Sequence, residues 1–184
     1  MIVIRRARLA DAPAIGAVHV ASWRSAYAGI LPDDFLASLS VGRQAAYYER
    51  VIQDRGFVHV ACASGPDLPG AAGARVVGFA SSGRARMRAI AEGEIETLYL
   101  LDDWREQGIG RRLIAASAAA LAASGCRSAM VWVLRENPSR WFYEHIGGRT
   151  AAESEIRVGG APVMQTALVW NPIDRLLASA AQQK

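Results

Sequence analysis

Seven segments of the chain carry the hydrophobic pattern of β-strands. In most of them apolar and polar residues alternate, and β-branched or aromatic side chains are frequent. The final two segments flank Gly159 and Gly160 and are expected to form a hairpin. A second hairpin loop is predicted at 66–74, where Gly, Pro and Ala are common. The predicted strands are residues 2–6, 56–63, 75–81, 94–101, 128–134, 151–158 and 162–170.

Helical spacing of apolar residues, with start and stop signals, predicts helices between these strands. Asp11 is a candidate N-cap with Pro13 in the first turn, so the first helix is expected to run to about Tyr27. An Ala- and Leu-rich run over 111–124 ends at Gly125, a residue common just past a helix end. Further helices are predicted after Asp33 or Asp34, over 41–52, from 137–138 to 147, and over 172–181.

The order of these elements predicts the architecture. The strand, helix and strand from Glu94 to Leu134 form a crossover unit, so these two strands are expected to be parallel neighbours. The other strands are expected to run antiparallel. We therefore expect an α/β protein of the α+β type, with a mixed, mostly antiparallel central sheet of about seven strands and helices on both faces. No repeat or boundary divides the sequence, so residues 1–184 are interpreted as a single domain.

Composition narrows the class of protein. Hydrophobic residues make up 52% and charged residues 21% of the chain, which favours a globular fold over disorder. No apolar run approaches the roughly 20 residues that a bilayer requires. No membrane association is therefore expected, and a cytoplasmic location is the default. The net charge of +4 suits an anionic ligand, but the arginines are scattered, so no nucleic-acid binding is expected. The two cysteines and three histidines lie far apart, which predicts no metal site.

The segment from 93 to 125 carries the clearest chemical signal. A predicted strand is followed by a turn containing Gly108 and Gly110, and the turn leads directly into a helix. The first N–H groups of a helix have no partner within the helix, and glycines let an anion approach the backbone closely. Positive side chains beside the turn are Arg105, Arg111 and Arg112, and Glu106 offsets part of their charge.

The spacing of the glycines distinguishes between phosphate ligands. A dinucleotide-binding turn requires a third glycine where Leu113 stands, and a Walker A loop requires a Lys that this turn lacks, so NAD or ATP binding is disfavoured. The pattern R-x-x-G-x-G from Arg105 to Gly110 resembles the acetyl-coenzyme-A pyrophosphate loop of the GNAT N-acetyltransferase superfamily. The plain alternative is a turn whose glycines only ease packing.

A second resemblance lies downstream. Residues 137–148, NPSRWFYEHIGG, are similar to the GNAT segment N-x-x-A-x-x-F-Y-E-x-x-G-F and to its shorter form N-P-x-R-x-F-Y-E. The spacing from Asn137 to Tyr143 is one residue shorter than in the commonest form, and Gly148 replaces the usual Phe. Both segments occur in the order and at the separation typical of the superfamily. The resemblance implies a GNAT acyl-CoA N-acyltransferase fold, with acetyl-CoA as co-substrate.

The resemblance also implies the cofactor contacts. Backbone groups of Leu98 and Leu100 would bond the pantetheine arm as an added strand would, beside a bulge that separates this strand from 128–134. Backbone N–H groups of the turn would hold the pyrophosphate, and Asn137 would reach the pantetheine amide. The cofactor-binding residues expected on this basis are Leu98, Tyr99, Leu100, Arg105, Glu106, Gln107, Gly108, Ile109, Gly110, Arg111 and Asn137.

The reaction that the resemblance implies is direct attack of a primary amine on the thioester within a ternary complex. The amine must lose a proton, and the leaving sulfur gains from receiving one. Tyr143 matches the acid of the superfamily; the alternative is a core Tyr on a helix face. Glu96 and Glu94 are candidate bases because residues two apart share one face of a strand. Glu96 lies nearer the expected thioester, and some members of the superfamily use no protein base.

The acceptor is left open by the sequence. Trp23, Arg24 and Tyr27 either line an acceptor pocket or pack on the sheet. The main hypothesis is an N-acetyltransferase acting on a small-molecule or protein amine. The alternative is a non-catalytic acyl-CoA-binding sensor or regulatory module of the same fold. A homodimer is possible, since Trp132, Trp141 and Trp170 either complete a core or form a dimer face.

Overall fold

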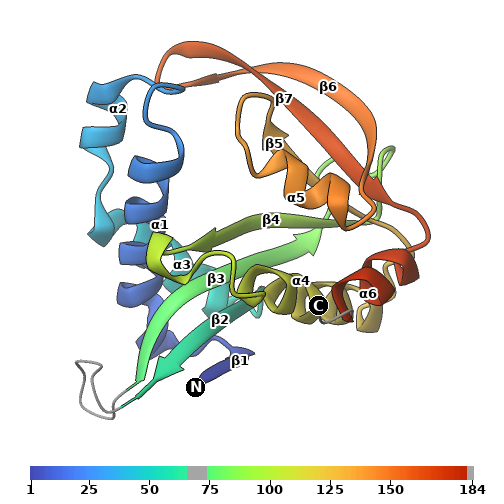
Figure 1. Ribbon diagram of the computed structural model, residues 1–184, viewed down its shortest axis with the longest axis horizontal. Coiled ribbons are helices and arrows are strands. Elements are labelled where there is room, and N and C mark those ends of the chain that lie inside the picture. The colour runs from blue at the N-terminus through green and yellow to red at the C-terminus, as the bar shows by residue number, and fades with distance from the viewer. Residues whose placement is uncertain (66–73, 182–184) are drawn as a thin grey trace.

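The computed structural model describes residues 1–65 and 74–181, so the hairpin loop predicted at 66–74 lies outside the described residues except for Ala74. Seven strands form one sheet in the order β1-β2-β3-β4-β5-β7-β6 (Figure 1). Only β4 and β5 pair in parallel, and the other described neighbours are antiparallel, as predicted. The strands are β1 (Ile2–Arg6), β2 (Phe57–Ser64), β3 (Ala74–Arg84), β4 (Gly93–Leu100), β5 (Ala129–Leu134), β6 (Arg149–Val158) and β7 (Ala161–Trp170).

Helices cover both faces of this sheet, which confirms the predicted fold class. Helices α1 and α3 pack on one face through the cluster around Ile15 and Tyr48, and α4 and α6 pack on the other (Figure 1). The helices are α1 (Ala12–Ala26), α2 (Asp33–Ser38), α3 (Val41–Gln53), α4 (Ile109–Ala123), α5 (Arg140–His145) and α6 (Asp174–Ala181), with 3₁₀ turns η1 (Leu9–Asp11) and η2 (Asp102–Trp104).

Asp11 stands at the predicted N-cap position of α1, but its carboxylate caps a different turn. It accepts a hydrogen bond from the Arg8 N–H at 2.7 Å and binds the Arg5 guanidinium through both oxygens. No side-chain bond reaches the first N–H groups of α1. The reason is that η1 runs directly into α1, so the carboxylate faces back along the chain. The hydrogen bonds from Arg5 lower the pKa of Asp11.

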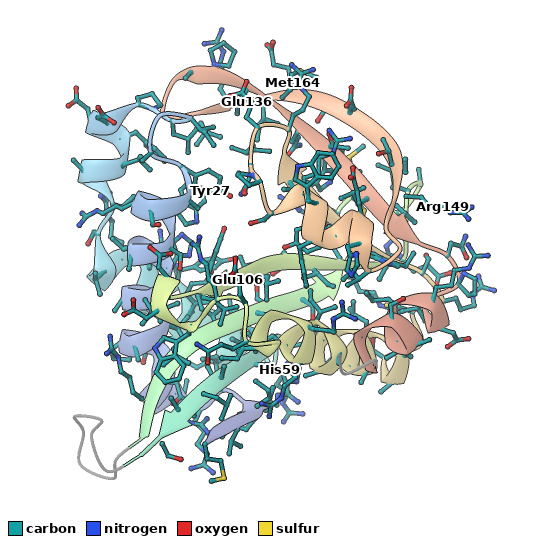
Figure 2. The ribbon with its side chains drawn as sticks, viewed as in Figure 1. Tyr27, His59, Glu106, Glu136, Arg149 and Met164 are labelled. Atoms are coloured by element: carbon teal, nitrogen blue, oxygen red, sulfur yellow. The ribbon has the colours of Figure 1, made fainter. Side chains whose placement is uncertain are left out.

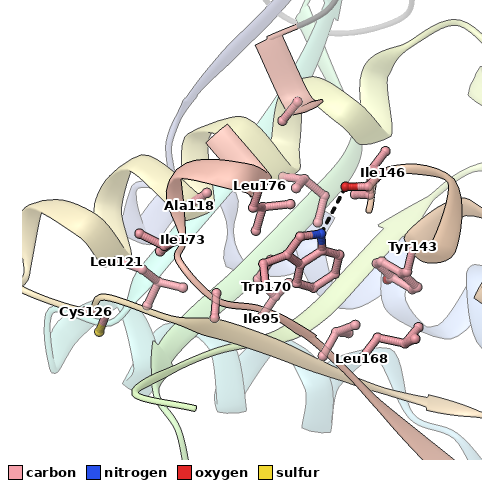
Figure 3. Close-up of a cluster of buried hydrophobic side chains, with 14 of the residues drawn as sticks. Ile95, Ala118, Leu121, Cys126, Tyr143, Ile146, Leu168, Trp170, Ile173 and Leu176 are labelled. Atoms are coloured by element: carbon pink, nitrogen blue, oxygen red, sulfur yellow. Dashed lines mark hydrogen bonds between the residues drawn. The ribbon is translucent and has the colours of Figure 1, made fainter. Parts of the chain in front are cut away.

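Trp170 anchors the core on the α4 side of the sheet (Figure 3). Its ring is 1% exposed, and its Nε1–H donates to the Ile146 carbonyl at 3.0 Å. This satisfied polar contact ties the residue that follows α5 to the end of β7. Tyr143, on α5, belongs to the same cluster, so the core fixes the position of this side chain.

The centre of the sheet is partly open. Strands β4 and β5 pair only over Gly93–Ile95 and Ala129–Val131. The register against β3 then shifts, because Ser81 faces Thr97 while Ser82 faces Ile95, which makes Glu96 the extra residue of a β-bulge. Ile95 and Leu98, three residues apart, consequently both pack on the α4 side. Beyond the bulge β4 continues beside β3 while β5 continues beside β7, so the two strands separate.

Candidate active site

A cavity of about 500 Å³ lies where β4 and β5 separate. Its walls come from α1, β4, the turn before α4, β5, and the segment from the end of β5 through α5. Figure 2 shows two of these residues, Tyr27 at the end of α1 and Glu106 in the turn before α4. The cavity is lined by Ser22, Ala26, Tyr27, Glu96, Thr97, Leu98, Tyr99, Leu100, Arg105, Glu106, Gly108, Gly110, Arg111, Val131, Trp132, Val133, Asn137, Pro138, Ser139, Phe142 and Tyr143.

The turn before α4 contributes Arg105, Glu106 and Gly108 to the lining of this cavity. Glu106 and Gly108 both adopt left-handed backbone conformations, with φ values of 61° and 73°. A left-handed conformation is uncommon for a Glu, and such strain clusters at ligand sites. A Cβ added at Gly108 would meet no atom within 4 Å, so the space beside this glycine is open. The backbone N–H of Arg112 donates to the Gly108 carbonyl, which is the first hydrogen bond of α4. The N–H groups of the residues before Arg112 therefore have no acceptor within the helix.

The side chains of the turn divide into two groups. Arg105 pairs with Asp102 at 2.8 Å, Arg111 donates to the Ser179 carbonyl at 2.9 Å, and both line the cavity. Gln107 and Ile109 do not line it. The Gln107 amide donates to the Asp103 carbonyl, and Ile109 is buried against the sheet. These two predicted contact residues therefore have only their backbone N–H groups to offer a ligand.

The second wall is the free side of β4. The Leu101 N–H donates to the Val77 carbonyl of β3, so the backbone groups of Leu100 point away from β3 because successive residues of a strand alternate. The Leu100 carbonyl already accepts a hydrogen bond from the Ser22 hydroxyl at 3.1 Å. Tyr99 lies between Leu98 and Leu100, with its ring against His19 on the α1 side of the sheet.

Comparison with known sequences gives the family. The model of the FR47-like protein family matches residues 77–158, which include the bulge, the turn and α5. An uncharacterized N-acetyltransferase, YuaI of Bacillus subtilis strain 168, is 34% identical over 177 residues, 96% of each chain. The chain belongs to the GNAT N-acetyltransferase superfamily.

Solved structures show the same fold at lower sequence identity. A GCN5-related N-acetyltransferase from Rhodopseudomonas palustris superposes with a TM-score of 0.69 and 19% identity, over 92% of this chain and 94% of the other. YncA, a putative acetyltransferase of Salmonella typhimurium solved with its cofactor acetyl-CoA, superposes with a TM-score of 0.68 and 19% identity, over 93% and 94%. The N-acetyltransferase architecture therefore extends over most of the chain.

Tyr143 reaches the cavity of this N-acetyltransferase from α5. The residue is 5% exposed, its ring contacts Phe142 and Trp170, and it lines the cavity. Burial raises the pKa of the phenol, and the neighbouring Tyr27 raises it further. The hydroxyl therefore keeps its proton throughout the neutral range and is available as a donor. Tyr27 and Tyr99 also line the cavity, so three phenols share it.

Glu96 lies at the bulge and borders the cavity. Glu96 keeps an exposed surface. The surrounding protein nevertheless removes part of the water around its carboxyl group, and this desolvation raises the pKa of the carboxyl. The Ser81 hydroxyl opposes this effect by donating to the carboxylate at 3.2 Å, the nearby Glu94 adds to the increase, and Arg86 lowers the pKa. A carboxylate with a raised pKa at the mouth of a cavity can accept a proton.

Glu94 shares this face of β4, but its environment differs. The residue is 1% exposed and does not line the cavity. Its two oxygens accept hydrogen bonds from the guanidinium of Arg86, and one also accepts from the Arg86 N–H. A carboxylate fully engaged in this way is held by its partner, so the two candidate bases have different geometry although they lie only two residues apart.

Asn137 is buried and lines the cavity. Its Oδ1 accepts a hydrogen bond from the Ser139 N–H at 2.9 Å, so the side chain closes the turn between β5 and α5. The helix accordingly begins at Arg140, later than the predicted start at 137–138. Burial raises the pKa of Tyr27, and hydrogen bonding from the Asn137 side chain lowers it, so the NH₂ of Asn137 faces the Tyr27 oxygen at the cavity.

The aromatic residues at the end of α1 combine both roles considered from the sequence. Tyr27 lines the cavity, while Trp23 stacks on His19 and contacts Tyr27, so it packs against the α1 side of the sheet. Arg24 donates to the carbonyls of Leu36, Ala37 and Leu39 and so secures the helix after α1. Sequence reasoning missed the cavity residues Ser22 and Ala26, although their spacing of four placed them on one helix face with Ile15 and Val18.

Two negative findings concern the described residues only. Within residues 1–65 and 74–181, no group of three or more His, Cys, Asp or Glu side chains is arranged to hold a metal ion. No helix in this part of the chain has the length and apolar character needed to cross a bilayer.

Proposed function

We propose that the protein transfers the acetyl group of acetyl-CoA to a primary amine, by direct attack within a ternary complex. The observation that carries this proposal is the separation of β4 from β5 beside the entrance of α4. This arrangement combines an anion site with an unpaired strand side, and acetyl-CoA carries a diphosphate next to a chain of amides. The Salmonella structure of the same fold contains acetyl-CoA as its cofactor, which supports the assignment.

The residues of this chain fit that ligand. The N–H groups of Gln107, Gly108, Gly110 and Arg111 would hold the diphosphate, because they precede or begin α4 and Gly108 leaves open space beside them. Arg105 and Arg111 line the same part of the cavity and would add positive charge. The backbone of Leu98 and Leu100 would bond the pantetheine amides, with the NH₂ of Asn137 as a further donor.

Two side chains would move the protons of the reaction. Acetyl-CoA supplies an acetyl group activated as a thioester. Glu96 would accept the proton of the incoming amine, directly or through a water molecule, because its carboxylate borders the cavity and its pKa is raised. Tyr143 would donate a proton to the departing sulfur. Each such transfer typically contributes about 10²- to 10⁴-fold in rate.

Glu94 is the weaker candidate for the base. Its pairing with Arg86 would have to break before it could accept a proton from a substrate, and the Glu94 carboxylate, which is 1% exposed, would then lose its partner inside the protein. We therefore assign Glu94 the task of holding Arg86 near the mouth of the cavity. The acceptor remains a primary amine of a small molecule or of a protein.

Binding of acetyl-CoA tests the proposal. Saturating acetyl-CoA should raise the melting temperature, since a ligand that binds only the native state stabilises it. Gly108→Glu should abolish this increase by placing negative charge at the diphosphate. Gly125→Glu is the matched control: Gly125 follows the other end of α4, has a similar φ of 86°, and likewise has no atom within 4 Å of an added Cβ.

The control separates backbone strain from loss of the ligand. Both variants place a Glu in the left-handed region and should lose similar stability, but only Gly108→Glu should lose the response to acetyl-CoA. An equal response in both variants would contradict the assignment of the turn. Release of free thiol with a panel of amines then tests turnover. Binding without any thiol release would instead favour a non-catalytic acyl-CoA sensor.

A further inference from the structure

A group of buried polar side chains lies on the α1 and α3 side of the sheet, directly beside Glu96. This side is otherwise packed with apolar residues such as Phe79 and Val60. Ser81 is 2% exposed, and its hydroxyl lies 3.2 Å from a Glu96 oxygen and 2.8 Å from the Thr97 hydroxyl. The β-bulge creates this contact, because it brings Glu96 and Thr97 together opposite Ser81.

The polar group continues into the two helices. The Tyr48 hydroxyl of α3 lies 3.0 Å from Nδ1 of His19 on α1, and both residues are buried. The Thr97 hydroxyl is the polar neighbour that lowers the pKa of Tyr48 against the larger effect of burial. Hydrogen bonds therefore join His19 to Tyr48, and Thr97 through Ser81 to Glu96, and the effect of Thr97 on the pKa of Tyr48 connects the two groups.

The Glu96 carboxylate, a fixed acceptor at one end, sets the direction of these hydrogen bonds. The Glu96 carboxylate is an acceptor when ionised, so the single proton of the Ser81 hydroxyl points to it. Thr97 must then donate to Ser81, and its oxygen accepts from the Ser81 N–H at 3.1 Å. At the other end, burial lowers the pKa of His19 to about 4, so the imidazole is neutral near pH 7. We assign its one N–H to Nδ1, which donates to Tyr48 and leaves the Tyr48 proton for Thr97.

We propose that Ser81, which accepts from Thr97 and donates to Glu96, orients Glu96 and favours its ionised form as the proton acceptor. Tyr48 and His19 extend this polar group behind Thr97. This inference rests on the proposed function, in which Glu96 is the base. All four polar residues are positioning residues, since they act on the reaction through Glu96. Hydrogen bonds aligned in one direction polarise one another, and the low dielectric around buried groups strengthens the effect.

Other charged and titratable groups also face Glu96. Glu94, on the same strand, raises its pKa, and Arg86, after β3, lowers it. Tyr47 and Tyr48 face it from α3, where the negative charge of Glu96 raises the pKa of both phenols. Among the groups that favour the ionised carboxylate, Ser81 has the largest effect. The hydroxyl of Ser81 is therefore the link to remove.

The test is the pH dependence of thiol release in Ser81→Ala. Loss of the hydrogen bond removes a stabiliser of the ionised carboxylate, so the pKa of Glu96 should rise. The acid limb of kcat/KM should then move to higher pH by about one pH unit, the size expected for one hydrogen bond to a charged group. Ser82→Ala is the matched control, because Ser82 is the next residue, is 3% exposed, and has a buried hydroxyl without a hydrogen-bond partner. The acid limb of kcat/KM in Ser82→Ala should lie at the same pH as in the unaltered protein.

A second variant and a second readout complete the experiment. Tyr48→Phe removes the hydroxyl beyond Thr97, which Thr97 and Ser81 separate from Glu96, and should move the limb in the same direction by a smaller amount. The Glu96 carboxyl can also be titrated by carbon NMR in the protein alone, with Glu96→Gln to assign its signal. An unchanged Glu96 pKa in both Ser81→Ala and Tyr48→Phe would overturn the proposal. A raised pKa in a protein that releases no thiol would retain the orienting role of Ser81 and remove the proposed reaction.

Discussion

At the scale of single residues, the active-site candidates differ mainly in what already occupies their polar atoms. Glu94 and Glu96 share one face of β4, but Arg86 engages Glu94 while Glu96 borders the cavity. Likewise, Tyr143 shares the cavity with Tyr27. Residue type and spacing alone do not separate such pairs, because the difference lies in neighbours from other elements.

Replacement of Tyr143 distinguishes it from the other phenols. Tyr143→Phe should slow thiol release by about 100-fold or more, the lower range for loss of a general acid. Binding of acetyl-CoA, measured by the rise in melting temperature, should persist because the ring still fills the site beside Trp170. Tyr27→Phe removes a phenol from the same cavity and serves as the control, with a much smaller effect on rate. Equal rates for Tyr143→Phe and the unaltered protein would remove Tyr143 as the acid.

At the scale of elements, α1 and α3 approach so closely that no side chain fits at one point. A Cβ added at Gly16 on α1 would lie 2.7 Å from both the Val41 carbonyl oxygen and the Ala45 nitrogen. These are backbone atoms of α3, which cannot rotate away. The close contact matters for the site, because these helices carry His19, Ser22 and Tyr48.

The same substitution should therefore have opposite effects at two helical glycines. Gly16→Ala should lower the free energy of unfolding by about 1–3 kcal/mol, because overpacking forces the helices apart. Gly42→Ala, on exposed surface of α3 where the nearest atom is 3.9 Å away, should raise it by up to about 1 kcal/mol, because Ala favours the helix. Urea denaturation measures both values. Stabilisation by Gly16→Ala would show that the helices separate more easily than their spacing indicates.

At the scale of the whole molecule, the two parts of the sheet are joined at its centre by a short parallel pairing. Only Gly93–Ile95 and Ala129–Val131 connect β4 with β5, while antiparallel pairs such as β6 and β7 run over whole strands. A ligand that hydrogen-bonds to the free side of β4 would add a strand-like partner where β4 and β5 have separated. Acetyl-CoA is thus expected to act as a structural link as well as a substrate.

Hydrogen exchange resolved by residue tests this expectation. Saturating acetyl-CoA should slow exchange of the Leu98 and Leu100 amides, which alternate away from β3. The Tyr99 amide lies between them, faces β3 and should change less. This contrast between neighbours is the signature of a strand-like ligand. Equal slowing of all three amides would indicate general stabilisation of the sheet.

The sequence by itself determined the order of the elements and the chemistry of the turn. Strand alternation and helical spacing are local signals, so the strands and helices were predicted to within a few residues. The parallel neighbours and the mostly antiparallel sheet followed from the length and order of the connections. The turn was recognisable because its glycines, arginines and following helix are contiguous in the chain.

Only the tertiary structure distinguished the candidate side chains from one another. The bulge at Glu96, its contact with Ser81 and the ion pair of Glu94 with Arg86 depend on how β3 and its following loop lie against β4. His19 and Tyr48 are 29 residues apart and meet only because α1 and α3 pack together. Such contacts join segments distant in sequence, and their energies depend on burial and exact distance. The local pattern of hydrophobic residues in a sequence gives neither the burial of a side chain nor its distance from another.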